Sequence, residues 1–136
     1  MVAEESFYRR TFHPRIISTT TEEAFHNYFV LNDIKIDYLH IDAGHSYENV
    51  KEDFELYTQI LSTNAIVSIH DTDPNYADKY IVTNEVKDRG DFDDWTGPIK
   101  FNQEIDETKW EKLNLFNFGI VKNKPSSTGI TILRKK

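Results

Sequence analysis

Ionisable side chains gather where two apolar segments of the sequence end. They are His40 and Asp42 at the end of the first segment with His45 just beyond it, and His70 and Asp71 just after the second. Because burying an unpaired charge is costly, such groups are rarely placed together unless a partner, a ligand or water stabilises them. Carboxylate oxygens suit a hard divalent cation, and a histidine beside them suits proton transfer to or from a reacting group. The pattern therefore favours a cation site with a general base nearby.

Each of these residues also has an ordinary structural explanation. His40 could hydrogen-bond a neighbour in the core, and Asp71 could cap the turn that follows it. His45 could simply belong to the turn before Ser46. A functional site is favoured because two carboxylates, each with a histidine nearby, follow successive predicted strands, whereas a single short motif often misleads.

The two apolar segments, Ile36–Asp42 and Ala65–Ile69, are short and rich in residues that favour strands. The helix between them is predicted to begin at Ser46, whose hydroxyl suits the N-cap position. Its apolar stripe recurs at spacings of four, three and four residues, at Val50, Phe54, Tyr57 and Leu61. We expect this helix to end at residues 62–64, with Asn64 in the left-handed conformation that a helix end favours.

A strand, a helix and a strand in this order form a unit whose strands are parallel and whose crossover is right-handed. Ligands of such sheets bind outside the carboxyl ends of the strands. Asp42 and Asp71 both stand at such an end, so we expect them to line one cleft together with His45. Their carboxylates should approach within about 8 Å, close enough to share a hydrated cation.

The remaining segments complete an α/β fold with a Rossmann-like, mostly parallel sheet in one domain over residues 1–136. A short strand at Arg15–Ser18 is followed by a helix that begins in a capping box and runs to about Asn32. The chain is expected to close with an antiparallel hairpin of the strands Leu113–Val121 and Gly129–Arg134. Two further helices are expected near Lys79–Lys87 and Gln103–Lys112.

Composition excludes several classes of function. The net charge of -7 leaves no basic stripe that could neutralise nucleic-acid phosphates. The absence of cysteine excludes disulfides, thiolate metal sites and cysteine catalysis. The sequence contains neither an apolar segment long enough to span a membrane nor the apolar core of a signal peptide. We therefore expect a cytoplasmic protein that acts on a small molecule, without a nucleic-acid or membrane partner.

Four segments of the sequence resemble a known family. HIDAGHSYENVKEDFELYTQIL, followed by AIVSIHDT, resembles the second half of a class I S-adenosylmethionine-dependent methyltransferase. It is most similar to the group whose fourth strand ends in a pattern like I-D-G-x-H-S-Y and whose fifth strand ends in H-D. The closing segments FNFGIV and GITILRK are similar to the last two strands of that fold. The resemblance is strong over residues 36–72, fair over 113–136 and weak over 1–31.

The resemblance implies methyl transfer to a hydroxyl of a small molecule, assisted by Mg²⁺ or another divalent cation. By position, Asp42 and Asp71 correspond to metal ligands, and Thr72 stands where related cation-dependent O-methyltransferases have the third ligand, an asparagine. His45 corresponds to the base that takes the substrate proton, and Asp42 with Ala43 to the cofactor-binding position. Because methyl transfer is an in-line displacement, the protein contributes positioning and deprotonation.

The chain departs from this family in its cofactor-binding half. Its five glycines are scattered, no G-x-G occurs, and the family's glycine-rich loop after strand one has no counterpart. Ala43 also replaces the usual glycine after the first aspartate. If the alignment is right, the first two strands of the fold lie upstream of Met1. The expectation is then a partial methyltransferase domain, a fragment that is inactive alone.

Two other functions stay open on the sequence. A metal-dependent hydrolase could use the five ionisable residues at the strand ends, although no hydrolase signature such as H-x-H-x-D-H is present. A binding module without chemistry is the other alternative. In the methyltransferase fold, strand one lies beside strand four, so its loss would leave Ile36–Asp42 at an edge of the sheet. Such an edge presents unpaired backbone groups, and we expect self-association through it.

Overall fold

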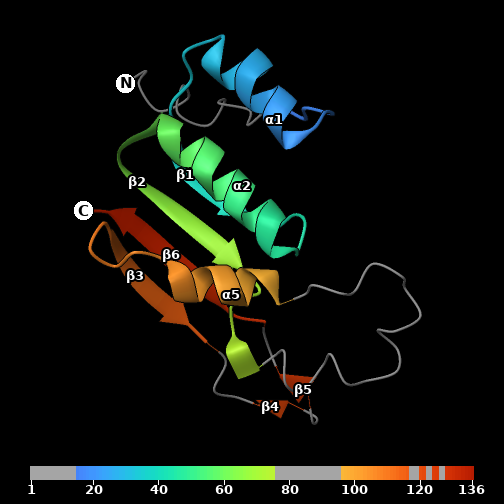
Figure 1. Ribbon diagram of the computed structural model, residues 1–136, viewed down its shortest axis with the longest axis vertical. Coiled ribbons are helices and arrows are strands. Elements are labelled where there is room, and N and C mark those ends of the chain that lie inside the picture. The colour runs from blue at the N-terminus through green and yellow to red at the C-terminus, as the bar shows by residue number, and fades with distance from the viewer. Residues whose placement is uncertain (1–14, 76–95, 117–119, 122–123, 126–127) are drawn as a thin grey trace, which may run out of the picture.

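The computed structural model describes residues 15–75, 96–116, 120–121, 124–125 and 128–136. Its main element is a four-stranded sheet in the order β1-β2-β6-β3, shown in Figure 1. The bounds are Ile36–Ile41 for β1, Leu61–His70 for β2, Trp110–Leu115 for β3 and Ile130–Lys135 for β6. β1 and β2 are parallel, whereas β6 is antiparallel to both β2 and β3. The α/β fold, the parallel pair and the antiparallel closing strands agree with the sequence prediction.

Helix α2 (Tyr47–Tyr57) connects the two parallel strands, as predicted. It begins at Ser46, whose hydroxyl accepts a hydrogen bond of 3.1 Å from the backbone N–H of Asn49. The stripe residues Val50 and Phe54 are buried. The N-cap sets where α2 starts, so it also fixes the length of the loop that follows β1.

The predicted end of this helix was wrong in one respect. α2 passes into a short 3₁₀ turn, η2 (Thr58–Ile60), and β2 begins at once with Leu61. Asn64 does adopt a left-handed conformation (φ 65°), but inside β2, at an irregularity in its pairing with β1. Ile36 pairs with Leu61 and Tyr38 with Ile66, so β2 carries three extra residues there. The left-handed residue therefore forms a bulge instead of ending the helix.

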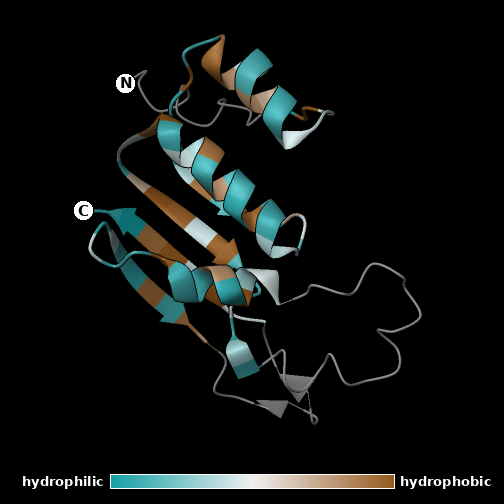
Figure 2. Cartoon of the chain, in the orientation of Figure 1, coloured by the Kyte–Doolittle hydropathy of each residue, from teal (hydrophilic) through white to brown (hydrophobic). Residues whose placement is uncertain are grey.

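One face of the sheet forms the hydrophobic core with α2 and with α5 (Gly97–Glu104). Figure 1 shows both helices on the same side of the sheet, and Figure 2 shows hydrophobic residues concentrated in β2 and β6 beneath them. The buried residues of this core are Ile41, Val50, Phe54, Val67, Ile69, Phe101, Ile105, Trp110 and Leu133. Burying each large side chain contributes about 1.5–3 kcal/mol, so this core anchors β1, α2 and β2 in their relative positions.

The opposite face is not covered by α2 or α5. Alternation along the strands and their register place Tyr38, Ile66, Ile132 and Leu113 there. Tyr38 and Leu113 are exposed, at 60% and 56% of their surface. In the described sheet β1 is an end strand, as expected for the segment at residues 36–42.

The N-terminal helix is confirmed, but the strand before it is not. Residues 15–18 are irregular and exposed, because no described strand lies beside them to pair with. α1 (Thr21–Ala24) begins at Thr20, which accepts a hydrogen bond of 3.2 Å from the backbone N–H of Glu23. It continues as a π-helix, η1 (Phe25–Val30).

The boundaries near the C-terminus differ from the prediction. The helix expected at Gln103–Lys112 is wrong, because α5 ends at Glu104 and β3 begins at Trp110. Between them Asp106 forms a turn, in which its Oδ1 accepts a hydrogen bond of 2.9 Å from the N–H of Thr108. This local hydrogen bond competes with a helical backbone.

The closing strands match the prediction in pairing but not in length. β3 lies earlier than the expected Leu113–Val121 and pairs along its whole length with β6. A separate two-stranded sheet of β4 (Ile120–Val121) and β5 (Lys124–Pro125) lies between them in sequence. The helix expected at Lys79–Lys87 falls outside the described residues. None of the helices in the described ranges has the length and apolar character needed to cross a lipid bilayer.

Candidate functional site

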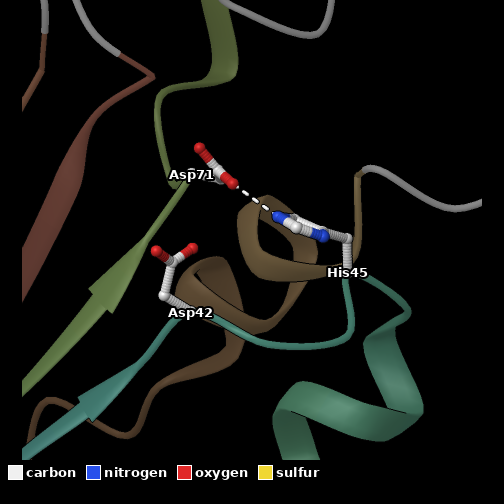
Figure 3. A group of neighbouring side chains, drawn as sticks. All are labelled: Asp42, His45 and Asp71. Carbon is white, nitrogen blue, oxygen red and sulfur yellow. Dashed lines mark hydrogen bonds and ion pairs between the residues drawn. The ribbon is translucent and has the colours of Figure 1, made fainter. Parts of the chain in front are cut away.

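The two strand-end carboxylates and the predicted base come together. Asp42 directly follows β1, Asp71 directly follows β2, and His45 lies in the loop that leads into α2. Figure 3 shows the three side chains pointing into one space. One potential ligand atom of each lies within 4.8 Å of those of the other two. The parallel pairing of β1 and β2 explains this, because it aligns the carboxyl ends of both strands.

Asp71 is the buried member of the group. Its side chain is 8% exposed, and its Oδ2 lies 2.6 Å from Nε2 of His45. Its backbone is left-handed (φ 59°), a conformation that is uncommon outside glycine but tolerated by aspartate. The backbone N–H of Asp71 donates a hydrogen bond of 3.0 Å to the carbonyl of Gly129, just before β6. The neighbouring strand thus holds Asp71 in a sparsely populated conformation, a feature that is enriched at functional sites.

The loop that carries His45 is held by α5 as well as by α2. A Cβ atom at Gly97, the first residue of α5, would lie 2.3 Å from the carbonyl oxygen of His45 and 2.4 Å from the backbone nitrogen of Tyr47. Only glycine allows two backbones to approach this closely. The N-terminus of α5 therefore packs directly against the His45 loop and limits its movement.

His70, the last residue of β2, also faces both carboxylates. Its Nδ1 lies 3.3 Å from Oδ1 of Asp42 and 3.1 Å from Oδ1 of Asp71. This nitrogen is buried and makes no hydrogen bond. His70 entered the sequence prediction only in the hydrolase alternative. The adjacent His-Asp pair at the end of a strand was the available signal, but regular alternation would have sent these two side chains to opposite faces.

His40 has a different environment. Its Nδ1 lies 2.7 Å from the hydroxyl oxygen of Ser68, which is also 2.7 Å from the hydroxyl of Tyr38. Its Nε2 is 3.9 Å from Oδ2 of Asp42. His40 therefore bonds a neighbour within the sheet, as its ordinary structural explanation holds, and lies farther from the carboxylates than His45 and His70.

Thr72 and Ala43 are the other two residues that the resemblance singled out. Thr72 is fully buried, and its hydroxyl oxygen accepts a hydrogen bond of 2.9 Å from the hydroxyl of Thr131 on β6. Ala43 is exposed and, with Asp42, lines a cavity of about 330 Å³. The structure thus engages the Thr72 hydroxyl in the core and leaves Ala43 at an open surface.

This cavity runs along the outer edge of β1. Its lining residues are Thr21, Phe29, Ile36, Tyr38, Leu39, His40, Ile41, Asp42, Ala43, Asp53 and Tyr57. On its helical wall, burial raises the pKa of the Asp53 carboxyl group and of the Tyr57 hydroxyl. The wall is therefore a partly desolvated environment, and the cavity reaches Asp42 at one end.

Comparison with known proteins identifies the family of this chain. The sequence matches the family described as "Methyltransferase domain" over residues 2–72, which include β1, α2 and β2 with Asp42, His45 and Asp71. It is also 37% identical over 59 residues to an uncharacterized protein, y4gI, of Sinorhizobium fredii. That alignment covers 43% of this chain and 6% of the relative.

A solved structure supports the fold. A crystal structure of a candidate caffeoyl-CoA O-methyltransferase from Staphylococcus aureus superposes with a TM-score of 0.60 and 23% sequence identity. The match covers 90% of this chain and 51% of that one. The chain thus spans about half the length of the solved structure and a small part of the curated relative.

Proposed function

Because the chain belongs to the methyltransferase-domain family, we propose that it takes part in methyl transfer from S-adenosylmethionine to a hydroxyl of a small molecule, with a divalent cation at the strand ends. The observation that carries this proposal is the convergence of Asp42, His45 and Asp71 from three separate positions in the sequence. A carboxylate pair with an imidazole beside it provides both groups that hydroxyl methylation needs, a cation site and a base.

The donor set fits a divalent cation. Asp42 and Asp71 each offer carboxylate oxygens, and the Asp42 side chain, 44% exposed, leaves the site open on one side. Two buried or partly buried carboxylates repel each other unless a cation or a proton lies between them. When bound, the cation would polarise a substrate hydroxyl and lower its pKa.

His45 is the proposed base. Its Nε2 contacts Oδ2 of Asp71, so the carboxylate fixes the orientation of the imidazole ring. A ring that accepts the hydroxyl proton becomes an imidazolium, and the negative charge of Asp71 beside it stabilises that form. The deprotonated oxygen would then be ready to accept the methyl group that the bound donor supplies.

S-Adenosylmethionine is the donor that the family implies, and when bound it supplies an electrophilic methyl group. We place part of it in the cavity at the edge of β1, next to Asp42 and Ala43. The support for this is that both residues line the cavity, that Phe29 and Tyr57 add aromatic surface to it, and that it reaches the carboxylate cluster. Aromatic and apolar walls with a few polar groups are typical of small-molecule sites.

Isothermal titration calorimetry tests this proposal on the whole chain. We expect heat of binding with S-adenosylmethionine and, separately, with a divalent cation, and we expect Asp42→Asn to weaken the cation binding. Formation of S-adenosylhomocysteine with a panel of phenols and sugars, followed by mass spectrometry, then identifies the acceptor, and His45→Ala should reduce its rate. Cation binding alone would favour the hydrolase alternative. Absence of both binding events would favour a binding module and contradict the proposal.

Self-association through β1 is a second proposal. It rests on the position of β1 as an end strand of the described sheet, and a second strand on its outer side would compete with a ligand in the cavity along that edge. Size-exclusion chromatography with light scattering at several protein concentrations tests it. A mass of one chain at every concentration would refute it.

A further inference from the structure

We infer that His70 is the third protein ligand of the cation site and that the site therefore selects a first-row transition ion, such as Mn²⁺, Fe²⁺ or Co²⁺, over Mg²⁺. This inference rests on the proposed cation-dependent function and specifies the cation. The family resemblance indicated Thr72, the residue after Asp71, as the third ligand. The inference assigns that role to His70, the residue before Asp71. The argument depends on three donor atoms, Nδ1 of His70 and the Oδ1 atoms of Asp42 and Asp71.

The distances from Nδ1 of His70 to the two carboxylate oxygens are those between neighbouring ligands of one ion. Nδ1 of His70 lies 3.3 Å from one carboxylate oxygen and 3.1 Å from the other. Adjacent ligands of an octahedral ion with bonds near 2.1–2.2 Å are about 3.0–3.1 Å apart, and those of a tetrahedral ion with bonds near 2.0 Å are about 3.3 Å apart. Nδ1 of His70 can therefore share an ion with the carboxylate oxygen of Asp42 and with that of Asp71.

The surroundings of Nδ1 of His70 also favour its role as a ligand of the cation. It is buried and faces two carboxylates without donating a hydrogen bond to either. With its lone pair directed at two negatively charged oxygens, this nitrogen is placed to bind a cation that lies among the three atoms. A bound cation provides this nitrogen with a partner.

The other nitrogen of the ring supports this role. Nε2 of His70 lies 3.3 Å from the hydroxyl oxygen of Thr128. A hydrogen bond donated by Nε2 to that oxygen leaves Nδ1 unprotonated and directed at the carboxylates. Histidines that bind metals usually fix their orientation and tautomer through such a second hydrogen bond.

The base remains separate from this ligand set. Asp71 turns Oδ1 toward His70 and Oδ2 toward His45. One carboxylate therefore serves both groups, binding the cation with one oxygen and orienting the base with the other. The Thr72 hydroxyl is already bonded to Thr131 inside the core and is not needed as a ligand.

A nitrogen ligand changes the choice of cation. Mg²⁺ binds oxygen donors almost exclusively in proteins, whereas imidazole suits first-row transition ions. A set of one imidazole and two carboxylates should therefore bind Mn²⁺ more tightly than Mg²⁺, and Co²⁺ more tightly than Mn²⁺.

Pulsed electron paramagnetic resonance of the Mn²⁺-loaded protein tests the inference directly, because electron spin-echo modulation detects a coordinated imidazole nitrogen. We expect this modulation in the unaltered protein and its loss in His70→Ala. Removal of a ligand should weaken Mn²⁺ binding in calorimetry by more than the roughly 10- to 100-fold that loss of an outer-shell partner costs. The matched control is His40→Ala, which removes a histidine that lies near Asp42 but is bonded to Ser68, and it should keep the modulation.

Three results would overturn the inference: no nitrogen modulation in the unaltered protein, modulation that survives in His70→Ala, or equal affinities for Mg²⁺ and Mn²⁺. If His70→Ala does not fold, as judged by circular dichroism, His70→Gln replaces it, because it keeps a polar side chain without the ring nitrogen. Failure of the proposed function is seen separately, as absence of S-adenosylmethionine binding and methyl transfer. The spectroscopic result does not depend on either of these.

Discussion

The two strand-end carboxylates occupy equivalent positions in the sheet but differ in their surroundings. Asp42 ends β1 at the side of the described sheet, with a side chain that is 44% exposed and lines a cavity. Asp71 ends β2 between β1 and β6, with a side chain that is 8% exposed and a backbone bonded to Gly129. The difference follows from strand order, because an interior strand is enclosed by neighbours on both sides. We therefore expect Asp71 to contribute to both stability and binding, and Asp42 to binding alone.

Asp71→Ala should give the largest change in stability. It leaves the partly buried His45 without its acceptor, which costs about 1–3 kcal/mol, and it puts alanine in a left-handed conformation, which costs about 1–2 kcal/mol more. The free energy of unfolding from urea denaturation should fall by about 2–5 kcal/mol in total. Asp71→Asn is the control, since asparagine tolerates the left-handed conformation. Its free energy of unfolding should fall by less than that of Asp71→Ala. Equal losses in both variants would show that the backbone contributes nothing.

Gly97→Ala should give the second largest loss of stability, because it disturbs the loop that carries His45. Its Cβ would lie 2.3–2.4 Å from backbone atoms of residues 45–47, so the loop or α5 must shift, at a cost of about 1–3 kcal/mol. Cation affinity should fall as well, because Asp71 loses its contact with His45.

Gly44→Ala is the matched control for this variant. Its Cβ would also meet an atom at 2.3 Å, but that atom is Nδ2 of Asn49, the end of a flexible side chain that can rotate away. We expect thermal unfolding to show a clearly lower midpoint for Gly97→Ala than for Gly44→Ala. Similar midpoints would contradict the close packing of α5 on the loop.

Asp42→Asn should separate binding from stability. The side chain is substantially exposed, so the free energy of unfolding should change by no more than about 0.5 kcal/mol. Calorimetry should nevertheless show a large loss of cation affinity, because asparagine offers one neutral oxygen in place of a charged carboxylate. A large loss of stability without loss of affinity would reverse the comparison with Asp71.

Asp53→Asn should give the smallest change in stability, a gain that is seen only at neutral or higher pH. Burial raises the pKa of this carboxyl group, so the folded state holds the proton more tightly than the unfolded state. The stability of the unaltered protein is therefore expected to fall as pH rises from the unfolded pKa through the folded pKa. Because the side chain is only partly buried, solvent limits the gain in Asp53→Asn at pH 7 to less than about 0.5 kcal/mol. Thermal melts at pH 3 and pH 7 should differ between the two proteins only at pH 7.

Local signals in the sequence were sufficient to predict the elements that position the site. The N-cap at Ser46, the apolar stripe of α2 and the two apolar strands depend on interactions between residues close in the chain. The structure confirms them except for Leu61, which was predicted on the stripe but begins β2. The parallel pairing then followed from general rules of chain connection. That reasoning brought Asp42 and Asp71 to one edge of the sheet, together with His45.

The elements predicted less well depend on partners that are distant in the sequence. β3 begins at Trp110 because it pairs with β6 along its full length, a contact across about twenty residues that no local pattern indicates. Arg15–Ser18 has strand-like residues but no described neighbouring strand, and it stays irregular. Asn64 was correctly predicted to be left-handed, although only the pairing of β1 with β2 decided that it forms a bulge.

The sequence by itself determined which residues could do chemistry and on which side of the sheet they would meet. Only the tertiary structure decided how His70 and Asp71 are directed. Consecutive residues of a regular strand point to opposite faces, yet Nδ1 of His70 lies 3.3 Å from Oδ1 of Asp42 and Oδ2 of Asp71 lies 2.6 Å from Nε2 of His45. The reason is the left-handed backbone of Asp71, held by a hydrogen bond to Gly129 from a strand almost sixty residues away. That contact turns the end of β2, so that a histidine and an aspartate adjacent in the chain face one site.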